Sequence, residues 1–448
     1  MKLTGVDIAT ATGGVLSGEG GFGQVLTDTR GIVPGAWFLA IRGASFDGHD
    51  FVEAAAAAGA GGVVVSREVP FWTGAQVRVP DTTLALQDLG RFARAAYHGP
   101  VVGLTGSAGK TTTRALIALA LEPLGPVHQT VGNLNNHWGV PMTLLAAPDD
   151  AAALVVEMGT SGPGEIAVLA DIARPTVRLV LNIGPSHLLE LGGPAGVARE
   201  KGVLFASASA GDTLVVNLDD AAVAAMPRPE GVRVLTFGAR PEADVRIEGA
   251  VLDGLVTVVT LQTPDGPCTV RLGSPGLHLA SNVAAALACA YALGVNTVAA
   301  AQNLARYQPV GMRMRVEDLG GVTVLNDAYN ANPTSMSASL RALASLPGRR
   351  VAIIGSMLEL GDEEDRLHAD IARLAGELGL DRVVLVGEQM CMAAPCCVGA
   401  RALDTFPDPE DVAPELARWL RPGDHVLLKG SRGVRMERIL AGLREQRG

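Results

Sequence analysis

The sequence predicts an α/β protein of three domains. At 448 residues the chain is too long for one ordinary hydrophobic core, and roughly 150 residues per domain gives about three. Short apolar runs alternate with helical stretches along most of the chain, as in parallel sheets that are covered by helices. This pattern breaks at Tyr97-His98-Gly99-Pro100 and near Pro309, and a new series of strand-like runs follows each break.

Residues 1–97 predict a small α/β N-terminal domain. Its apolar runs 36–41 and 61–66 are expected to be strands, and the alanine-rich stretch 51–60 is expected to be a helix. Glycine turns separate these elements.

Residues 98–310 predict a central mononucleotide-binding domain of the P-loop type, with a mostly parallel sheet. The expected strands are the apolar runs 100–105, 153–158, 176–183 and 213–218. The stretch 244–272 alternates instead at period two and carries Asp-Gly turns, so it predicts antiparallel hairpins at the margin of the sheet. The sheet is therefore expected to be mixed.

Residues 311–448 predict a Rossmann-like C-terminal domain. The runs VTVLND, RRVAIIG, RVVLVG and HVLLKG have the apolar character of buried parallel strands. They alternate with stretches that predict helices at 334–346, 366–378, 410–420 and 433–446. This alternation is typical of a doubly wound fold.

Composition and charge exclude several classes of partner. Hydrophobic residues make up 48% and charged residues 18% of the chain, which is typical of a globular protein rather than a disordered one. The formal net charge of -10, without a long basic run, argues against binding to a nucleic-acid polymer. Small anionic substrates stay open, because local cations and a bound metal can invert the field in one cleft.

Cysteine usage and the N-terminal sequence predict a cytoplasmic protein without membrane insertion. The five cysteines are an odd number and form no CxxC pair, so free thiols in a reducing compartment are expected. The first residues lack the apolar core of a signal peptide, and no run of 18 apolar residues occurs.

The segment VVGLTGSAGKTTT predicts a phosphate-binding loop, because it places a buried strand, a glycine turn and a helix start in succession. Gly106 and Gly109 allow backbone N–H groups to turn toward an anion at a helix N-terminus. Lys110 is expected to reach the β- and γ-phosphates, and Thr111 to hold Mg²⁺. The strict GxxxxGK[ST] spacing is not met, since Leu104 occupies the place of the first glycine. The alternative is a plain glycine turn before a helix.

Glu157 is predicted to be a Mg²⁺ ligand. It ends the apolar strand ALVVE, which puts a carboxylate at the carboxyl edge of a parallel sheet, where such folds bind their ligands. The alternative is a solvated acid at a strand end.

Lys201 is expected to lie on the apolar stripe of a helix. Val197, Lys201, Leu204, Phe205 and Ala208 follow a helical spacing. Burial favours the neutral amine, the form that reacts with CO₂ to give an anionic carbamate able to bind Mg²⁺. Spacing alone favours the alternative, a lysine whose stem covers apolar surface while its amine reaches water.

Several blocks together resemble the Mur ligase family. The shortened loop GxxGKTT is similar to that of Mur ligases and folylpolyglutamate synthetases. Three more blocks resemble the family, and within it the member that adds D-alanyl-D-alanine: LTDTRGIVPGAWFLAIRGASFDGHDF (26–51), VGNLNNHWGVPMTLL (131–145) and DAYNANPTSM (327–336). The resemblance covers nearly the whole chain in order.

The resemblance implies an ATP-dependent ligase of peptidoglycan precursor synthesis, with the N-terminal domain binding the UDP-linked substrate. Its expected reaction joins D-alanyl-D-alanine to the terminal carboxylate of UDP-N-acetylmuramoyl-tripeptide through an acyl phosphate, with the chain acting as a monomer. The alternatives are a sibling Mur ligase that adds the third amino acid and a catalytically silent nucleotide-binding module. The blocks 131–145 and 327–336 disfavour the sibling, and a folylpolyglutamate synthetase would lack the first domain.

The resemblance also implies roles for individual residues. It implies catalytic roles for Lys110, Glu157, His187 and Lys201, and two Mg²⁺ ions held by Thr111, Glu157, His187 and Lys201 as its carbamate. Asn282 matches an adenine-reading asparagine, with a helix cap as the alternative, and Asp327 matches a ribose ligand. Arg313 matches a phosphate-binding arginine, with Arg315 as the other register. The whole implied ATP-binding set is Gly106, Ser107, Ala108, Gly109, Lys110, Thr111, Thr112, Asn282, Arg313, Asp327 and Asn330.

Three groups of polar residues are implied in binding the substrates. The turn of Thr27, Asp28, Thr29 and Arg30 is expected to contact the uridine end, with a simple turn as the alternative. The pyrophosphate or muramoyl part is expected near Asn133, Asn135, Asn136 and His137. The dipeptide carboxylate is expected near Lys429, Ser431 and Arg432, for which a plain anion-binding turn is equally good. Departures from the family pattern are Ala108, Arg114, Leu279 and Ser356.

Overall fold

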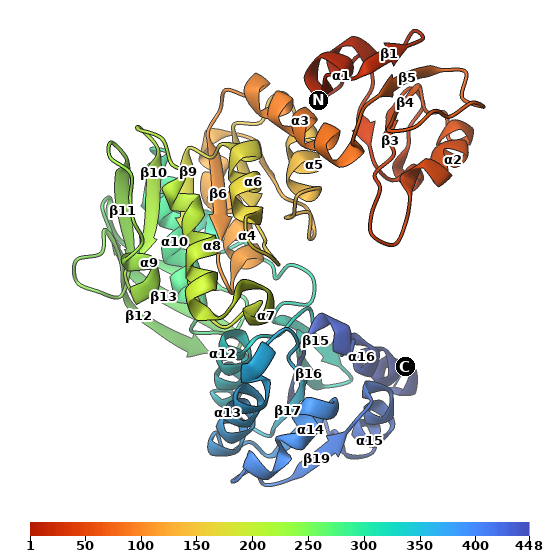
Figure 1. The fold of residues 1–448 in the computed structure, drawn as a ribbon. Coiled ribbons are helices and arrows are strands. Elements are labelled where there is room, and N and C mark those ends of the chain that lie inside the picture. Colours follow the sequence, from red (N-terminus) through yellow and green to blue (C-terminus); the bar gives the residue numbers. More distant parts are fainter. Residues whose placement is uncertain (448) are drawn as a thin grey trace.

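A computed structural model describes residues 1–447, which form three lobes that are each built around one sheet (Figure 1). The N-terminal lobe is red to orange, the central lobe orange through yellow and green to teal, and the C-terminal lobe blue. The central lobe lies between the other two. The prediction of a three-part α/β fold is confirmed.

The N-terminal lobe holds a five-stranded sheet in the order β1-β5-β4-β3-β2, in which only β1 runs antiparallel to its neighbour. Its strands are β1 (Val15–Ser17), β2 (Val25–Leu26), β3 (Trp37–Leu39), β4 (Gly62–Val65) and β5 (Ala75–Arg78). Its helices are α1 (Gly5–Thr12), η1 (Thr29–Gly31), η2 (Gly48–Phe51), α2 (Val52–Ala57) and α3 (Thr82–Ala96). The two predicted strands and the alanine-rich helix correspond to β3, β4 and α2.

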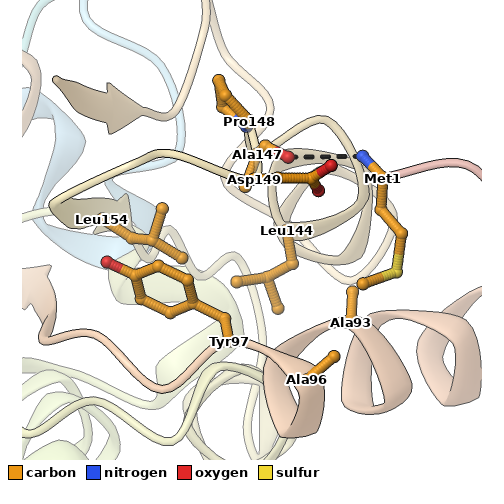
Figure 2. A pocket seen from close by; sticks show the side chains of 9 residues that line it. All are labelled: Met1, Ala93, Ala96, Tyr97, Leu144, Ala147, Pro148, Asp149 and Leu154. Atoms are coloured by element: carbon orange, nitrogen blue, oxygen red, sulfur yellow. Dashed lines mark hydrogen bonds between the residues drawn. The ribbon is translucent and has the colours of Figure 1, made fainter.

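Helix α3 joins the first two lobes into one continuous core. It begins at Asp81, whose Oδ1 accepts hydrogen bonds from two backbone N–H groups, and it packs against α1 as well as against α5 and α6 of the central lobe. Gly90 permits the close approach, because a Cβ there would lie 2.6 Å from the Cβ of Pro141. The same junction holds a cavity of about 160 Å³ beside Tyr97, where the Met1 ammonium donates a hydrogen bond to the carbonyl of Ala147 (Figure 2).

The central lobe holds a nine-stranded sheet in the order β14-β13-β12-β11-β10-β9-β6-β8-β7. The strands from β12 to β7 run parallel, whereas β12, β13 and β14 pair antiparallel, as the period-two stretch 244–272 predicts. The strands are β6 (Val101–Thr105), β7 (Val127–Gln129), β8 (Ala153–Glu157), β9 (Val177–Val180), β10 (Thr213–Asn217), β11 (Arg233–Gly238), β12 (Val245–Asp253), β13 (Val256–Thr263) and β14 (Gly266–Leu272).

Helices cover both faces of the central sheet. The apolar core on one face gathers side chains from α4, α10 and α11, and the core on the other face gathers them from α3, α5, α6 and α8. The helices are α4 (Lys110–Leu121), η3 (Glu122–Leu124), α5 (Gly139–Leu145), α6 (Glu165–Ala173), α7 (Leu188–Leu191), α8 (Pro194–Ala206), α9 (Ala221–Ala224), α10 (Leu279–Ala292) and α11 (Thr297–Leu304).

The C-terminal lobe holds a six-stranded sheet in the order β15-β16-β20-β17-β18-β19, parallel except for β15. The strands are β15 (Arg315–Leu319), β16 (Val322–Asp327), β17 (Arg350–Gly355), β18 (Arg382–Val386), β19 (Leu403–Phe406) and β20 (His425–Lys429). The helices are α12 (Pro333–Ala344), η4 (Gly361–Glu363), α13 (Glu364–Glu377), α14 (Glu388–Met392), η5 (Ala394–Cys396), η6 (Pro409–Asp411), α15 (Val412–Trp419), η7 (Arg432–Val434) and α16 (Glu437–Arg447). The four predicted strands are present, and the edge strands β15 and β19 are additions.

Two further features concern membrane-spanning helices and the cysteines. Within residues 1–447, no helix combines the length and apolar character that crossing a bilayer requires. All five cysteines are free thiols, and burial raises the pKa of Cys289 beyond the range in which a thiolate forms readily.

Candidate active site

The predicted phosphate loop runs from the end of β6 into α4. Gly109 caps this helix with a left-handed φ of 80°. A Cβ on Gly109 would lie 3.0 Å from Oδ1 of Asn282, a buried residue of α10. The loop therefore needs glycine both for its backbone conformation and for its contact with Asn282.

Asn182, which follows β9, braces the loop from one side. The backbone N–H of Ser107 donates to the Asn182 carbonyl (3.1 Å), and that of Ala108 donates to Oδ1 of the same residue (2.9 Å). These two amides are therefore bonded within the protein in the present structure, and the contact of the loop amides with an anion stays a prediction. The first N–H groups of α4 have no carbonyl partner within the helix, which leaves the helix start as the anion-facing edge.

Lys110 occupies the start of α4 as the motif predicts. Its Nζ donates to the carbonyl of Gly106 at 2.7 Å, which closes the loop on itself. Burial lowers the pKa of Lys110, the nearby Glu157 opposes that shift, and Arg313 adds to it. Thr112, two positions further, is close to the hydroxyl of Tyr307, whose pKa burial raises.

Glu157 is almost fully buried at the end of β8, with 2% of its surface exposed. Its Oε1 accepts from Asn135 Nδ2 at 2.8 Å and from Thr111 Oγ1 at 3.3 Å. Its Oε2 lies 3.3 Å from Nη1 of Arg114, which is also buried. A solvated acid, the alternative left open by the sequence, does not fit this burial.

The pair of Thr111 and Glu157 fits a magnesium ion. Adjacent oxygen ligands of an octahedral Mg²⁺ at about 2.1 Å lie about 3 Å apart, close to the 3.3 Å between Oγ1 and Oε1. Within residues 1–447, no group of three or more His, Cys, Asp or Glu side chains is arranged to hold a metal ion. The expected ligand set does not need such a group, because it combines Glu157 and His187 with a hydroxyl and a modified lysine.

Lys201 is buried on α8, as its place in the apolar stripe predicts, with 1% of its surface exposed. Among the described residues, no hydrogen bond or ion pair engages its amine, and its neighbour Glu200 instead accepts from the backbone N–H groups of Gly164 and Ile166. Burial lowers the pKa of Lys201 to about 7, with Lys110 adding to the shift and Glu200 opposing it. The side chain of Lys201 is therefore enclosed almost completely, and a lysine that lies along the surface fits less well.

His187 lies at the start of α7 with a left-handed φ of 51°. Its Nδ1 lies 2.7 Å from Oε2 of Glu359, but outside hydrogen-bond geometry. Burial lowers the pKa of His187, Glu359 opposes the shift, and Lys110 and Lys201 add to it. His187 is therefore within electrostatic reach of both lysines. Glu359, from the C-terminal lobe, was not anticipated from the sequence.

The C-terminal lobe contacts the phosphate loop directly. Asn332 Nδ2 donates to the carbonyl of Ser107 at 3.1 Å, across 225 positions of the chain. The guanidinium of Arg313 lies 3.7 Å from the ring centre of Tyr329, whereas Arg315 is exposed and lies 4.0 Å from Glu317.

Asp327 and Lys429 form a buried ion pair of 2.6 Å. The Asp327 carboxylate also accepts from the Met314 N–H and from Ser339 Oγ, and Lys429 Nζ donates to the carbonyl of Asn330. Lys429 is therefore engaged inside its own domain rather than facing the cleft. The Ser431 hydroxyl is likewise bonded within the domain, while Arg432 is exposed and pairs with Glu437.

Residues 27–30 belong to the N-terminal lobe, which lies on the opposite side of the central lobe from the C-terminal lobe (Figure 1). Arg30 donates three side-chain hydrogen bonds to the carboxylate of Asp28 and lowers the pKa of Asp28 to about 2. Thr29 starts the short helix η1, and Thr27 Oγ1 lies 3.6 Å from Met142 Sδ of α5. In the expected uridine segment, Asp28 and Arg30 are thus exposed beside the central lobe, whereas Thr27 and Thr29 are half-buried.

The polar side chains of the asparagine-rich loop 131–139 have different partners. Asn136 Oδ1 accepts from the N–H groups of Trp138 and Gly139 at the start of α5, and Asn135 binds Glu157. Asn133 is exposed, and the ring of His137 lies 4.8 Å from that of Trp138. Asn135 and Asn136 thus make side-chain hydrogen bonds within the protein, whereas among the described residues no such bond is formed by the side chains of Asn133 and His137.

A cavity of about 750 Å³ lies between the central and C-terminal lobes. Its walls include Gly184 and Leu188 on the central side, and Leu360 and Glu363 on the C-terminal side. Gly184 is bonded in both directions to Ser107 Oγ of the phosphate loop. The cavity therefore adjoins the phosphate loop.

Three family models match the chain in succession. The Mur ligase catalytic-domain model matches residues 22–94, the Mur ligase middle-domain model matches residues 104–290, and the Mur ligase glutamate ligase domain model matches residues 312–432. The chain belongs to the Mur ligase family.

Several relatives of this Mur ligase are described as ligases that add D-alanyl-D-alanine. The UDP-N-acetylmuramoyl-tripeptide–D-alanyl-D-alanine ligase of Synechocystis sp. is 38% identical over 427 residues, which cover 94% of this chain and 91% of that protein. A crystal structure of MurF from Acinetobacter baumannii superposes with a TM-score of 0.92 at 33% identity, covering 99% of both chains. The MurF ligase of Thermotoga maritima in complex with ADP superposes with a TM-score of 0.84 at 30% identity, covering 95% of this chain and 97% of that one.

Proposed function

We propose that this Mur ligase joins D-alanyl-D-alanine to the terminal carboxylate of UDP-N-acetylmuramoyl-tripeptide, at the expense of ATP. The observation that carries the proposal is the electrostatic proximity of Lys110, His187 and Lys201 to one another, and of Glu157 to Lys110, at the start of α4. The relatives' names supply the substrates. A silent nucleotide-binding module would have no use for a buried lysine without a partner.

ATP is proposed to bind between the central and C-terminal lobes. The start of α4 and Lys110 are suited to the phosphates, Asn282 to the adenine beside Gly109, and Arg313 to the phosphates from the C-terminal side. Asp327 and Asn330 complete the proposed nucleotide site. Lys429 Nζ forms an ion pair with the Asp327 carboxylate at 2.6 Å. We therefore propose that Lys429 orients this carboxylate rather than binding the dipeptide.

Thr111, Glu157, His187 and a Lys201 carbamate are proposed to hold two Mg²⁺ ions. Bound Mg²⁺ would neutralise the charge that develops on the transferred phosphoryl group. The buried amine of Lys201, close to Lys110, supports the carbamate because an anion there would offset the positive charge of the neighbouring lysine.

The protein's own groups are proposed to act by position rather than by covalent catalysis. A carboxylate oxygen of the tripeptide attacks the γ-phosphorus, ADP leaves, and an acyl phosphate forms. Lys110 stabilises the negative charge of that transfer. The dipeptide amine then attacks the acyl carbon, loses a proton, and phosphate leaves with the former carboxylate oxygen. The apposed lobes exclude water, which would otherwise hydrolyse the acyl phosphate.

The uridine end is proposed to bind at Thr27, Asp28, Thr29 and Arg30, with Asn133 and His137 nearer the muramoyl part. Arg432 is proposed for the dipeptide carboxylate, because it alone of the three candidates is an exposed cation. The ligase is proposed to act as a cytoplasmic monomer.

Phosphate release with ATP, UDP-N-acetylmuramoyl-tripeptide and D-alanyl-D-alanine tests the proposal. Steady phosphate release is expected only when all three are present, together with a pentapeptide product. Turnover with a free amino acid on the dipeptide precursor, and none with D-alanyl-D-alanine, would instead identify the sibling ligase.

A further inference from the structure

The loop after β17 is the point where the C-terminal lobe meets the start of α7. The backbone N–H of Leu188 donates to the carbonyl of Glu359 at 3.2 Å. Two positions on, a Cβ built on Gly361 would lie 3.6 Å from the Cβ of Leu189. The Leu188 hydrogen bond and the close approach of the Gly361 backbone to Leu189 therefore hold the loop against α7 through main-chain atoms.

The Glu359 side chain makes a separate contact. Its Oε2 lies 2.7 Å from Nδ1 of His187, and the histidine is the more buried partner, with 26% of its side chain exposed against 54% for the glutamate. Both residues have left-handed backbones, with φ of 51° for His187 and 65° for Glu359. Such conformations are uncommon for residues other than glycine and persist where the surroundings hold them, often at functional sites.

We propose that Glu359 is a positioning residue for the ligation, which rests on the proposed function. A carboxylate that accepts the Nδ1 proton of a histidine fixes the tautomer and the ring orientation, and it leaves Nε2 with the lone pair. The present 2.7 Å approach lies out of line for a hydrogen bond, and the proposed role requires a rotation of the soft ring torsion of His187 that aligns Nδ1–H with the carboxylate. Glu359 thus orients, from the C-terminal lobe, a side chain of the central site.

A purely structural role fits Glu359 less well. The backbone contacts at Leu188 and Gly361 already hold the loop, and a half-exposed ion pair adds little to the stability of an interface. The positioning role predicts that removing the carboxylate harms the metal-bound reaction while the lobes stay in contact.

The test compares Glu359→Ala, Glu359→Gln and the control Glu415→Gln, which removes an exposed carboxylate paired with Arg418 far from the site. Loss of a carboxylate behind a metal-binding histidine typically weakens metal affinity or activity about 10- to 100-fold. We expect that loss in kcat for Glu359→Ala, with the KM for the UDP substrate within twofold of wild type. Glu359→Gln retains an oxygen acceptor for Nδ1, so its kcat should lie between those of Glu359→Ala and the wild type. Mn²⁺ binding with ADP, measured by electron paramagnetic resonance, should weaken in the same order.

A disulfide reports loop seating independently of turnover. Leu189→Cys with Gly361→Cys gives the 3.6 Å Cβ separation that lies within the about 3.5–4.5 Å of disulfides. Each single substitution controls for the native cysteines. The cross-link yield under mild oxidation should be unchanged when Glu359→Ala is added.

Two results would overturn the proposal. The first is a Glu359→Ala variant with wild-type kcat and Mn²⁺ affinity. The second is a cross-link yield that falls in parallel with activity when Glu359→Ala is added, because Glu359 would then hold the two lobes together. If the wild type itself fails to ligate the dipeptide, the proposed function falls, whereas the Mn²⁺ and cross-link measurements still decide the role of Glu359.

Discussion

Oγ1 of Thr111 lies 3.3 Å from Oε1 of Glu157, although 46 positions separate the two residues. Thr111 stands at the start of the helix that follows the phosphate loop, and Glu157 at the end of the neighbouring strand β8. A parallel sheet brings both to its carboxyl edge, where a shared cation can bridge them. The proposed phosphoryl transfer takes place at this edge of the sheet.

Glu157→Gln should abolish most activity. The amide keeps the size and one oxygen of the carboxylate, but it lacks the charge that a metal ligand supplies. We expect kcat to fall about 100-fold or more, corresponding to about 3 kcal/mol of transition-state stabilisation. Phosphate release measures the loss, and Glu248→Gln, an exposed residue of β12, is the matched control. Activity within threefold of wild type would rule out Glu157 as a metal ligand.

Lys201→Ala should be inactive and should regain part of its activity with added formate or acetate. The substitution leaves a cavity next to Lys110, and a small carboxylate there replaces the anionic charge of the proposed carbamate. Lys201→Arg is the matched control, because its guanidinium forms no carbamate and fills the cavity. Removing CO₂ and bicarbonate should lower wild-type activity reversibly. If the alanine variant regains nothing with either acid, the carbamate proposal fails.

Gly90→Ala should destabilise the junction of the first two lobes. The new methyl group would lie 2.6 Å from the Cβ of Pro141, so the two helices must separate or shift. Overpacking of this kind costs about 1–3 kcal/mol in the free energy of unfolding. Urea unfolding measures the loss, and Gly249→Ala, where an added Cβ meets nothing within 4 Å, should cost less. Equal unfolding free energies for the two variants would contradict the packing argument.

His368 should make the C-terminal lobe sensitive to mild acid. It is buried on α13, its Nε2 accepts from the Met357 N–H at 2.9 Å, and the ring contacts the Glu364 carbonyl through Nδ1. Burial lowers the pKa of His368 below 6.5, and Glu364 and Asp365 oppose the shift. The unfolded chain therefore takes up the proton first, and the stability that the neutral ring contributes above about pH 6.5 is lost as the pH falls.

The measurement compares unfolding free energies between pH 7.5 and 5 for wild type and His368→Gln. The wild type should lose stability more steeply, by at most about 1.4 kcal/mol per pH unit for this one group. Parallel pH profiles for the two proteins would show that His368 does not titrate on unfolding.

Local patterns were sufficient to predict the elements that carry the site. The apolar run, the glycine turn and the lysine predict a strand, a loop and a helix start around Lys110, and helical spacing predicts that Lys201 lies on the apolar stripe of its helix, because both are properties of short segments. The period-two stretch with its Asp-Gly turns likewise predicts the β12 to β14 hairpins.

The contacts between segments could not be predicted from such patterns. Asn182 bonds to the phosphate loop from 74 positions away, and Lys429 reaches Asp327 from 102 positions away. Sequence spacing shows which residues share a face, but the topology of two sheets decides which loops meet. Glu359 and the pairing of Lys429 were therefore missed, since each depends on a loop of one segment lying against another.

Transfer of oxygen-18 tests the proposed reaction most directly. The terminal carboxyl of UDP-N-acetylmuramoyl-tripeptide would be labelled, the ligation run with unlabelled ATP and D-alanyl-D-alanine, and the released phosphate examined by mass spectrometry. An acyl phosphate predicts that each phosphate carries one labelled oxygen from the carboxyl group. Unlabelled phosphate, with product formed at the normal rate, would contradict phosphoryl transfer to the carboxylate and with it the mechanism proposed for this site.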